Sequence, residues 1–237
     1  ASSALVGETK REFSIRDMKY DLGIQLTYPV SRTKSVTLGL VYSPQVHMST
    51  DVTPSEKLYV SDPYQNPWQS PAQVLMTDTL RDAKFNLPHT LGVGITYQTT
   101  NLLVGLDGTY EGWEGMAYPD KLDELTKDER FNNVFRVNAG FEYVADPYSP
   151  DFFQRVRFRG GLSYGNSYVN VNVFNPTRSD QRIGIGSYKE LGVNLGLGLP
   201  MHDLRTGHVS MVNIGFGYTR QHPDTDYMIK QDMFKIS

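Results

Sequence analysis

The stretch KELGVNLGLGLP, residues Lys189–Pro200, alternates strictly between aliphatic and non-aliphatic positions. Every second residue is Leu or Val, and the residues between them are Glu190, Gly192, Asn194, Gly196 and Gly198. Because side chains point to alternate faces of a β-strand, this stretch predicts a strand with one aliphatic face. That face needs a cover, either a protein core or the hydrocarbon of a membrane.

The same alternation recurs along most of the chain, often with Tyr near the ends of an apolar row, as in an aromatic girdle. Short turns alternate with longer polar connections, which is typical of an up-and-down barrel. The pattern predicts an all-β protein, an antiparallel up-and-down transmembrane β-barrel with about eleven strands in this chain. The other predicted strands are 18–28, 36–42, 47–60, 73–86, 91–97, 104–110, 131–143, 156–164, 212–218 and 227–237.

Composition limits the remaining classes. The chain of 237 residues has a net charge of −3 and no Cys, so neither nucleic-acid binding nor a disulfide framework is expected. No run of about 18 apolar residues predicts a transmembrane helix. A mean hydropathy of −0.42 still fits a membrane barrel, because half of each strand faces a polar interior. We expect one barrel domain over residues 1–237.

Three segments depart from the alternation, and the last predicted strand is cut short. Ala1–Glu12 is predicted as a leading segment or a loop, and Tyr168–Arg182 as a polar loop. PDKLDELTKDER is predicted to form a short helix with Asp120 near its N-cap. The last strand stops inside its pattern at Ser237 and the strand count is odd, so we expect an incomplete segment of a barrel. An open edge in lipid costs several kcal/mol per unpaired backbone group.

The polar positions of these strands are the candidate lumen-facing residues. They are Asp107, Glu111, Arg136, Glu142, Arg155, Arg157, Arg159 and Glu190. Arg155, Arg157 and Arg159 form a row of alternate residues, which we call the arginine row. This row allows two interpretations. It is a structural ladder neutralised by Glu142 and Glu190, or it is a site for an anionic group such as a carboxylate, which suits the planar guanidinium. A second feature is a patch of glycines, which marks either a bend in the strands or room for a plug or a ligand. The patch consists of Gly192, Gly196, Gly198, Gly215 and Gly217.

No catalytic pattern stands out. The five His residues stand singly, and no phosphate-binding loop, nucleophile elbow or metal-ligand spacing is present. We expect no enzymatic activity, no cofactor and no metal; a lipase-like barrel enzyme is the catalytic alternative.

Five segments carry a family resemblance. They are Asn86–Gly115, Arg157–Asn170 (RFRGGLSYGNSYVN), Tyr188–Met201, Val209–Gln221 and Tyr227–Ser237. Their order resembles that of FadL-type outer-membrane transporters of long-chain fatty acids and aromatic hydrocarbons. The resemblance implies a fourteen-stranded barrel, an N-terminal hatch domain in its lumen, and passive uptake of hydrophobic molecules through a lateral opening. No hatch sequence is recognised before Met18, the last strand ends early, and no ligand residues carry over.

These observations lead to three functional hypotheses. The first is a channel or transporter for hydrophobic compounds such as long-chain fatty acids. The alternative is a non-transporting structural or secretion-associated barrel that binds protein partners, with Tyr64, Trp68 and Trp113 in its contact loops. The third is a soluble β-rich binding domain. Under the first two, the protein lies in the outer membrane of a Gram-negative bacterium as a multi-pass protein. Its partners are then membrane lipid, hydrophobic small molecules, and secretion-system or other outer-membrane proteins.

Overall fold

The computed structural model describes residues 4–61, 73–76, 80–117, 127–175, 177–202 and 209–237. The chain divides into two compact units. Unit 1 contains Ala1–Lys19, Gln45–Leu87 and Met116–Glu124, and unit 2 contains Tyr20–Pro44, Pro88–Gly115 and Leu125–Ser237. The expectation of a single domain stays a prediction.

Unit 1 holds a four-stranded sheet in which β4 pairs with β1, β5 and β6. The strands are β1 (Ala4–Ile15), β4 (Val46–Ser61), β5 (Gln73–Met76) and β6 (Leu80–Leu87). The loop or leading segment predicted at Ala1–Glu12 is wrong, because β1 pairs with β4 along its whole length, from Ala4 opposite Ser61 to Ile15 opposite Thr50. Backbone pairing with β4 forms this strand, although its sequence does not alternate between apolar and polar residues.

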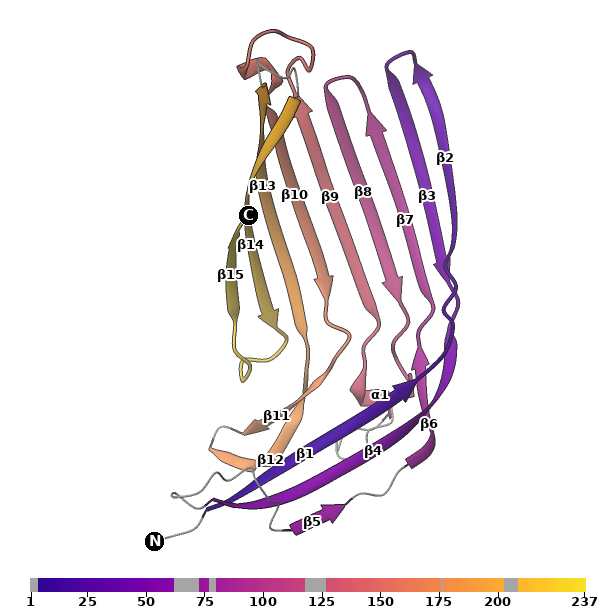
Figure 1. Ribbon diagram of the computed structural model, residues 1–237, viewed down its shortest axis with the longest axis vertical. Helices are drawn as coiled ribbons and strands as arrows, with labels where there is room; N and C mark the ends of the chain where they lie inside the picture. Colours follow the sequence, from indigo (N-terminus) through magenta and orange to yellow (C-terminus); the bar gives the residue numbers. More distant parts are fainter. Residues whose placement is uncertain (1–3, 62–72, 77–79, 118–126, 176, 203–208) are drawn as a thin grey trace. The chain divides into compact units, whose positions relative to one another are not determined.

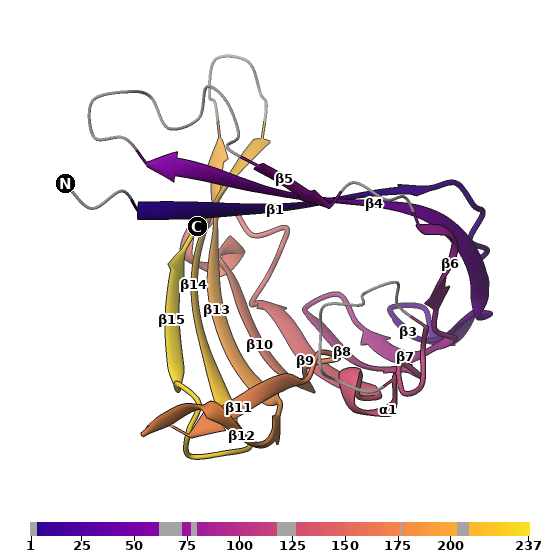
Figure 2. The ribbon, with the colours of Figure 1, turned by 90° about the horizontal axis from the view of Figure 1, so that it is seen from below.

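Unit 2 is built on a nine-stranded antiparallel sheet with the order β15-β14-β13-β10-β9-β8-β7-β3-β2. Figure 1 shows its strands side by side, and Figure 2 shows that the sheet is curved. The strands are β2 (Leu22–Ser31), β3 (Lys34–Ser43), β7 (Thr90–Gln98), β8 (Leu102–Glu111), β9 (Val134–Val144), β10 (Arg157–Asn166), β13 (Tyr188–His202), β14 (Val209–Pro223) and β15 (Gln231–Ile236).

The strand register gathers the aliphatic and aromatic positions on one face of this sheet, which we call the apolar face. Leu195, for example, lies opposite Gly160 on β10 and Phe216 on β14. The missing side chain at Gly160 is replaced by Phe141, whose ring carbon Cε1 lies 2.5 Å from where a Cβ would be. The predicted alternation is therefore confirmed: one continuous apolar surface runs across the nine strands.

The middle of the apolar face is exposed. Leu195 is 60% exposed, Leu162 57% and Val93 52%. The buried hydrophobic residues that the structure describes in unit 2 lie instead at strand ends and in connections: Phe131, Val134, Val144, Val156 and Val173. The sheet thus has no protein core over its apolar face within the described part of unit 2.

The two edge strands, β2 and β15, each pair with one neighbour in the described sheet. The apolar side chains of β2 at Leu22, Ile24, Leu26 and Tyr28 are 64–71% exposed. Closure into a barrel is not seen among the described strands. The all-β class and the antiparallel order are confirmed, and the closed transmembrane barrel stays a prediction.

The connections differ from the prediction in three places. The segment predicted as a polar loop, Tyr168–Arg182, holds β11 (Val171–Asn175) and the first half of β12 (Arg178–Gly186), which pair as a hairpin. Of the segment predicted as a helix, the structure describes Lys127–Arg130, which form α1, and the remainder with Asp120 lies outside the described residues. The structure describes fifteen strands instead of about eleven, since β1, β11 and β12 are added and the segment 73–86 is divided between β5 and β6.

No helical segment in the described part of the chain has the length and apolarity that a membrane crossing requires.

Candidate functional site

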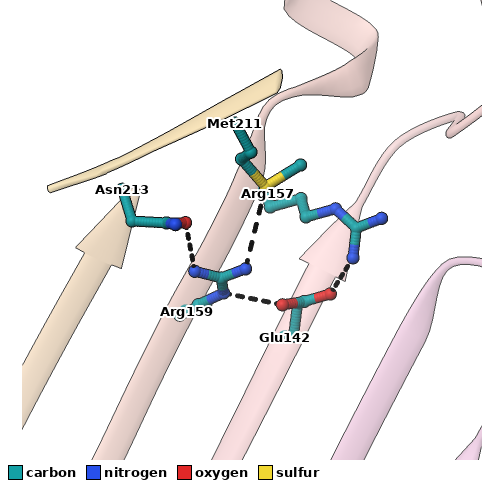
Figure 3. Close-up of polar contacts among 5 residues, drawn as sticks. All are labelled: Glu142, Arg157, Arg159, Met211 and Asn213. Carbon is teal, nitrogen blue, oxygen red and sulfur yellow. Dashed lines mark hydrogen bonds and ion pairs between the residues drawn. The ribbon is translucent and has the colours of Figure 1, made fainter. Parts of the chain in front are cut away.

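The face opposite the apolar face carries a cluster of charged side chains, which we call the arginine network (Figure 3). Glu142 on β9 accepts hydrogen bonds from Arg157 Nη1 at 2.5 Å and from Arg159 Nε at 2.6 Å, both on β10. Arg159 also donates from Nη1 to Asn213 Oδ1 on β14 at 2.7 Å, and its Nη2 lies 3.9 Å from Met211 Sδ. The network ties three strands together through side chains.

Two glycines of β13, Gly196 and Gly198, make room for this network. Strand β13 lies between β10 and β14, so the Arg159 side chain crosses it to reach Asn213. A Cβ at Gly196 would lie 3.4 Å from Arg159 Cβ. A Cβ at Gly198 would lie 3.2 Å from Arg157 Cβ, 3.1 Å from Met211 Sδ and 3.4 Å from Asn213 Oδ1. These two glycines therefore serve packing within the sheet, an explanation that neither sequence-based interpretation included.

The ladder interpretation of the arginine row is confirmed for Glu142 and wrong for Glu190. Glu190 lies opposite Gly165 on β10, several residues along the strand from Arg159, and it accepts a hydrogen bond from Gln221 Nε2 at 3.3 Å. Arg155 lies in the short 3-10 helix Phe153–Arg155 before β10 begins, so it is not part of the strand row.

The remaining candidates are dispersed over the same face. Asp107 accepts a hydrogen bond from Asn138 Nδ2 at 2.7 Å, and Glu111 accepts one from Trp113 Nε1 at 2.6 Å. Arg136 lines a separate pocket. The structure joins Glu142, Arg157 and Arg159 into one cluster, brings Arg136 and Glu190 to one pocket, and leaves Asp107, Glu111 and Arg155 apart. Whether these residues face a lumen stays a prediction.

An aromatic cluster organises the connections at the end of the sheet that carries β11 and β12. Trp113 stacks on Tyr168 with ring centroids 4.8 Å apart, and Phe131 lies 5.7 Å from Trp113 and 6.2 Å from Tyr168. Asn132 and Asn170 exchange side-chain hydrogen bonds beside it. Trp113, predicted as a partner contact, packs inside this loop cluster. Tyr64 and Trp68 lie outside the described residues.

Sequence reasoning missed Asn213, Met211 and Asn138 as functional neighbours. The alternation placed Asn213 and Asn138 on the polar face, but their partners sit on other strands, and only the register shows which strands meet. Within the described residues, no group of three or more His, Cys, Asp and Glu is placed to hold a metal ion.

Comparison with known proteins identifies a matching family model. The family model described as BamG matches residues 4–237, nearly the whole chain. No curated protein and no solved structure matches the chain significantly. The FadL-type resemblance is therefore wrong, and with it the predicted fatty-acid transport. Alternating strands and short turns are shared by antiparallel β-proteins of many families, so these patterns indicated the all-β antiparallel sheet without specifying the family.

Proposed function

Because the chain belongs to the BamG family, we propose that it is an outer-membrane β-sheet protein that binds the Bam complex, which assembles outer-membrane proteins. In this role it is a structural partner that holds other proteins. The alternative hypothesis of a non-transporting, partner-binding barrel leads to the same role. The apolar face, together with the family, supports the proposal most directly.

The exposed apolar face fits lipid as its cover. The outward row of β2 from Leu22 to Val30 extends over about 26 Å at ~3.3 Å per residue. The apolar band of outer-membrane barrels is of the same order, about 25 Å. In water, an apolar surface spanning nine strands would far exceed the few hundred Å² usual for monomeric soluble proteins. A lipid cover therefore favours a multi-pass position in the outer membrane of a Gram-negative bacterium.

The polar face supports a structural role. The arginine network links β9, β10 and β14 and fills the space above Gly196 and Gly198. Side chains that connect neighbouring strands occupy the space next to the polar face. A channel for diffusing molecules requires that space to be free. In a barrel, this face would line the lumen.

Co-purification from native membranes tests the proposal. The full-length protein, carrying an affinity tag, is extracted with mild detergent, and its partners are identified by mass spectrometry. We expect Bam components at near-stoichiometric yield, and we expect the protein to stay in the membrane during an alkaline carbonate wash. Release by carbonate would reject the membrane assignment. Recovery of no more Bam components than with an unrelated tagged outer-membrane protein would reject the partner.

Matched variants locate the contact. Trp113→Ala loosens the aromatic loop cluster at the β11–β12 end, whereas Tyr148→Ala removes an aromatic side chain, 86% exposed, from the β9–β10 connection at the opposite end. If the loop cluster shapes the partner surface, Trp113→Ala lowers recovery of Bam components at least fivefold and Tyr148→Ala leaves it within twofold. Equal recovery with both variants would place the contact elsewhere.

A further inference from the structure

A second feature of the polar face is a pocket of about 430 Å³. Its lining comes from β9, β10, β13 and β14 and from the residues that follow β10: Arg136, Asn138, Ser163, Gly165, Tyr168, Tyr188, Glu190 and Gln221 among them. Pockets of ~300–1,000 Å³ are typical of binding sites in proteins. The arginine network is not part of this pocket, which we call the Arg136 pocket.

The Arg136 guanidinium is available for a ligand. Its side chain lies over Gly165, where a Cβ would come within 3.3 Å of Arg136 Cγ. Among the residues that the structure describes, Arg136 has no ion pair and no side-chain hydrogen bond. A guanidinium that presents a planar fork of donors suits a carboxylate.

A carboxylate of the protein stands on the other side of the same pocket. Gly165 pairs with Arg136 on β9 and with Glu190 on β13, so these two charged residues belong to one cross-strand row with a glycine between them. Two strand spacings separate their Cα atoms by roughly 10 Å. The two side chains form no ion pair with each other among the described contacts. The pocket therefore presents a positive and a negative group on opposite sides.

The wall of the pocket is held in place by the loop cluster. Tyr168 stacks on Trp113. Asn166 Oδ1 accepts from the Phe135 backbone N–H at 2.8 Å, and Asn166 Nδ2 donates to the Asn133 carbonyl at 2.8 Å. A wall fixed by such contacts loses little conformational entropy when a ligand binds.

We propose that the Arg136 pocket binds an extended polypeptide segment of a partner, with an acidic residue on Arg136 and a basic residue about three positions away on Glu190. In the polyproline II form of an extended chain, side chains three positions apart point to the same side and their Cα atoms lie about 9 Å apart, close to the ~10 Å between the Cα atoms of Arg136 and Glu190. The inference rests on the proposed function, since a partner-binding protein of the Bam complex meets polypeptide at its loops. A small dipolar molecule would satisfy the same charges and is an outcome of the test.

The test places the photo-crosslinker p-benzoylphenylalanine at Gln221, which lines the pocket and forms only one long side-chain hydrogen bond in the described structure. The full-length protein is irradiated in native membranes and the products are sequenced by mass spectrometry. Arg136→Glu and Glu190→Gln are made in this background. Arg32→Glu, in the β2–β3 turn at the opposite end of the sheet, is the matched charge control.

We expect a crosslink to a polypeptide with an acidic and a basic residue within about three positions. Its yield falls at least fivefold with Arg136→Glu, falls with Glu190→Gln, and stays within twofold with Arg32→Glu. A product without polypeptide, a crosslinked segment lacking the two charges, or a yield that Arg136→Glu leaves unchanged would overturn the proposal. Gel mobility of unheated samples verifies folding of each variant. Co-purification of Bam components with the unmodified protein is scored separately, so failure of the proposed function is distinguished from failure of the pocket.

Discussion

Leu195→Arg tests the environment of the apolar face, because water and lipid predict different costs. Leu195 is in the middle of the β13 row and is 60% exposed. If the face meets lipid, an arginine near mid-bilayer lowers the free energy of unfolding by about 2–4 kcal/mol. At ~1.4 kcal/mol per factor of ten, the folding equilibrium constant falls roughly 30-fold to several-hundred-fold. If the face meets water, an exposed substitution changes the free energy by only about 0.5 kcal/mol.

Asn194→Arg is the internal control. Asn194 is the preceding residue on the same strand, but it lies on the polar face between Gly161 and Gly217. We expect it to cost much less than Leu195→Arg. Both variants are folded into phospholipid vesicles and unfolded with urea, and the folded fraction is read from gel mobility without heating. Equal, small costs for the two variants would refute a lipid-covered face.

Three further predictions concern the polar face and the loops. Gly198→Val should cost about 1–3 kcal/mol by overpacking the arginine network, whereas Gly39→Val should be near neutral in the same urea titration, because a Cβ at Gly39 meets no atom within 4 Å; equal effects would contradict the packing role. Glu142→Gln should lower stability by about 1 kcal/mol, since the arginines it binds are more than a third exposed. Additivity with Arg159→Gln in a double-mutant cycle would exclude the coupling. Trp113→Ala should speed protease cleavage of the β8–β9 connection at least fivefold, because two aromatic contacts of about 0.5–1.5 kcal/mol each are lost; an unchanged cleavage pattern would mean that these contacts do not hold the loop.

The sequence was most informative where side chains alternate. The rows through Leu195, Val93 and Phe216 predicted strands with one apolar face, because burial or lipid contact requires this period. The strand at Ala4–Ile15 was missed, since its polar and charged side chains carry no period and its pairing with β4 depends on backbone groups. The hairpin of β11 and β12 was missed because β11 is only five residues long and register shifts interrupt its pairing between Val173 and Asn175.

The candidate site was predicted less well, because it depends on register. Glu142 was correctly paired with the arginines, but Glu190 was not, since the pairing of β10 with β13 places it opposite Gly165. The role of Gly196 and Gly198 depends on an arginine from the next strand, which one-strand reasoning does not include. Arg136 was predicted as a candidate because it occupies a polar position of its strand. Its pocket is formed by residues of neighbouring strands, which a single strand does not reveal.

The direction of the edge strands limits how this sheet can become a wall without edges. Eight successive antiparallel pairings separate β2 from β15, so both edges run in the same direction. Direct joining of the two would form a parallel seam, whereas an entirely antiparallel ring contains an even number of strands. An odd number of additional strands is then needed, and the first and last of them run opposite to β2 and β15. A tryptophan or spin label introduced on β2 would report which of these seams forms in lipid.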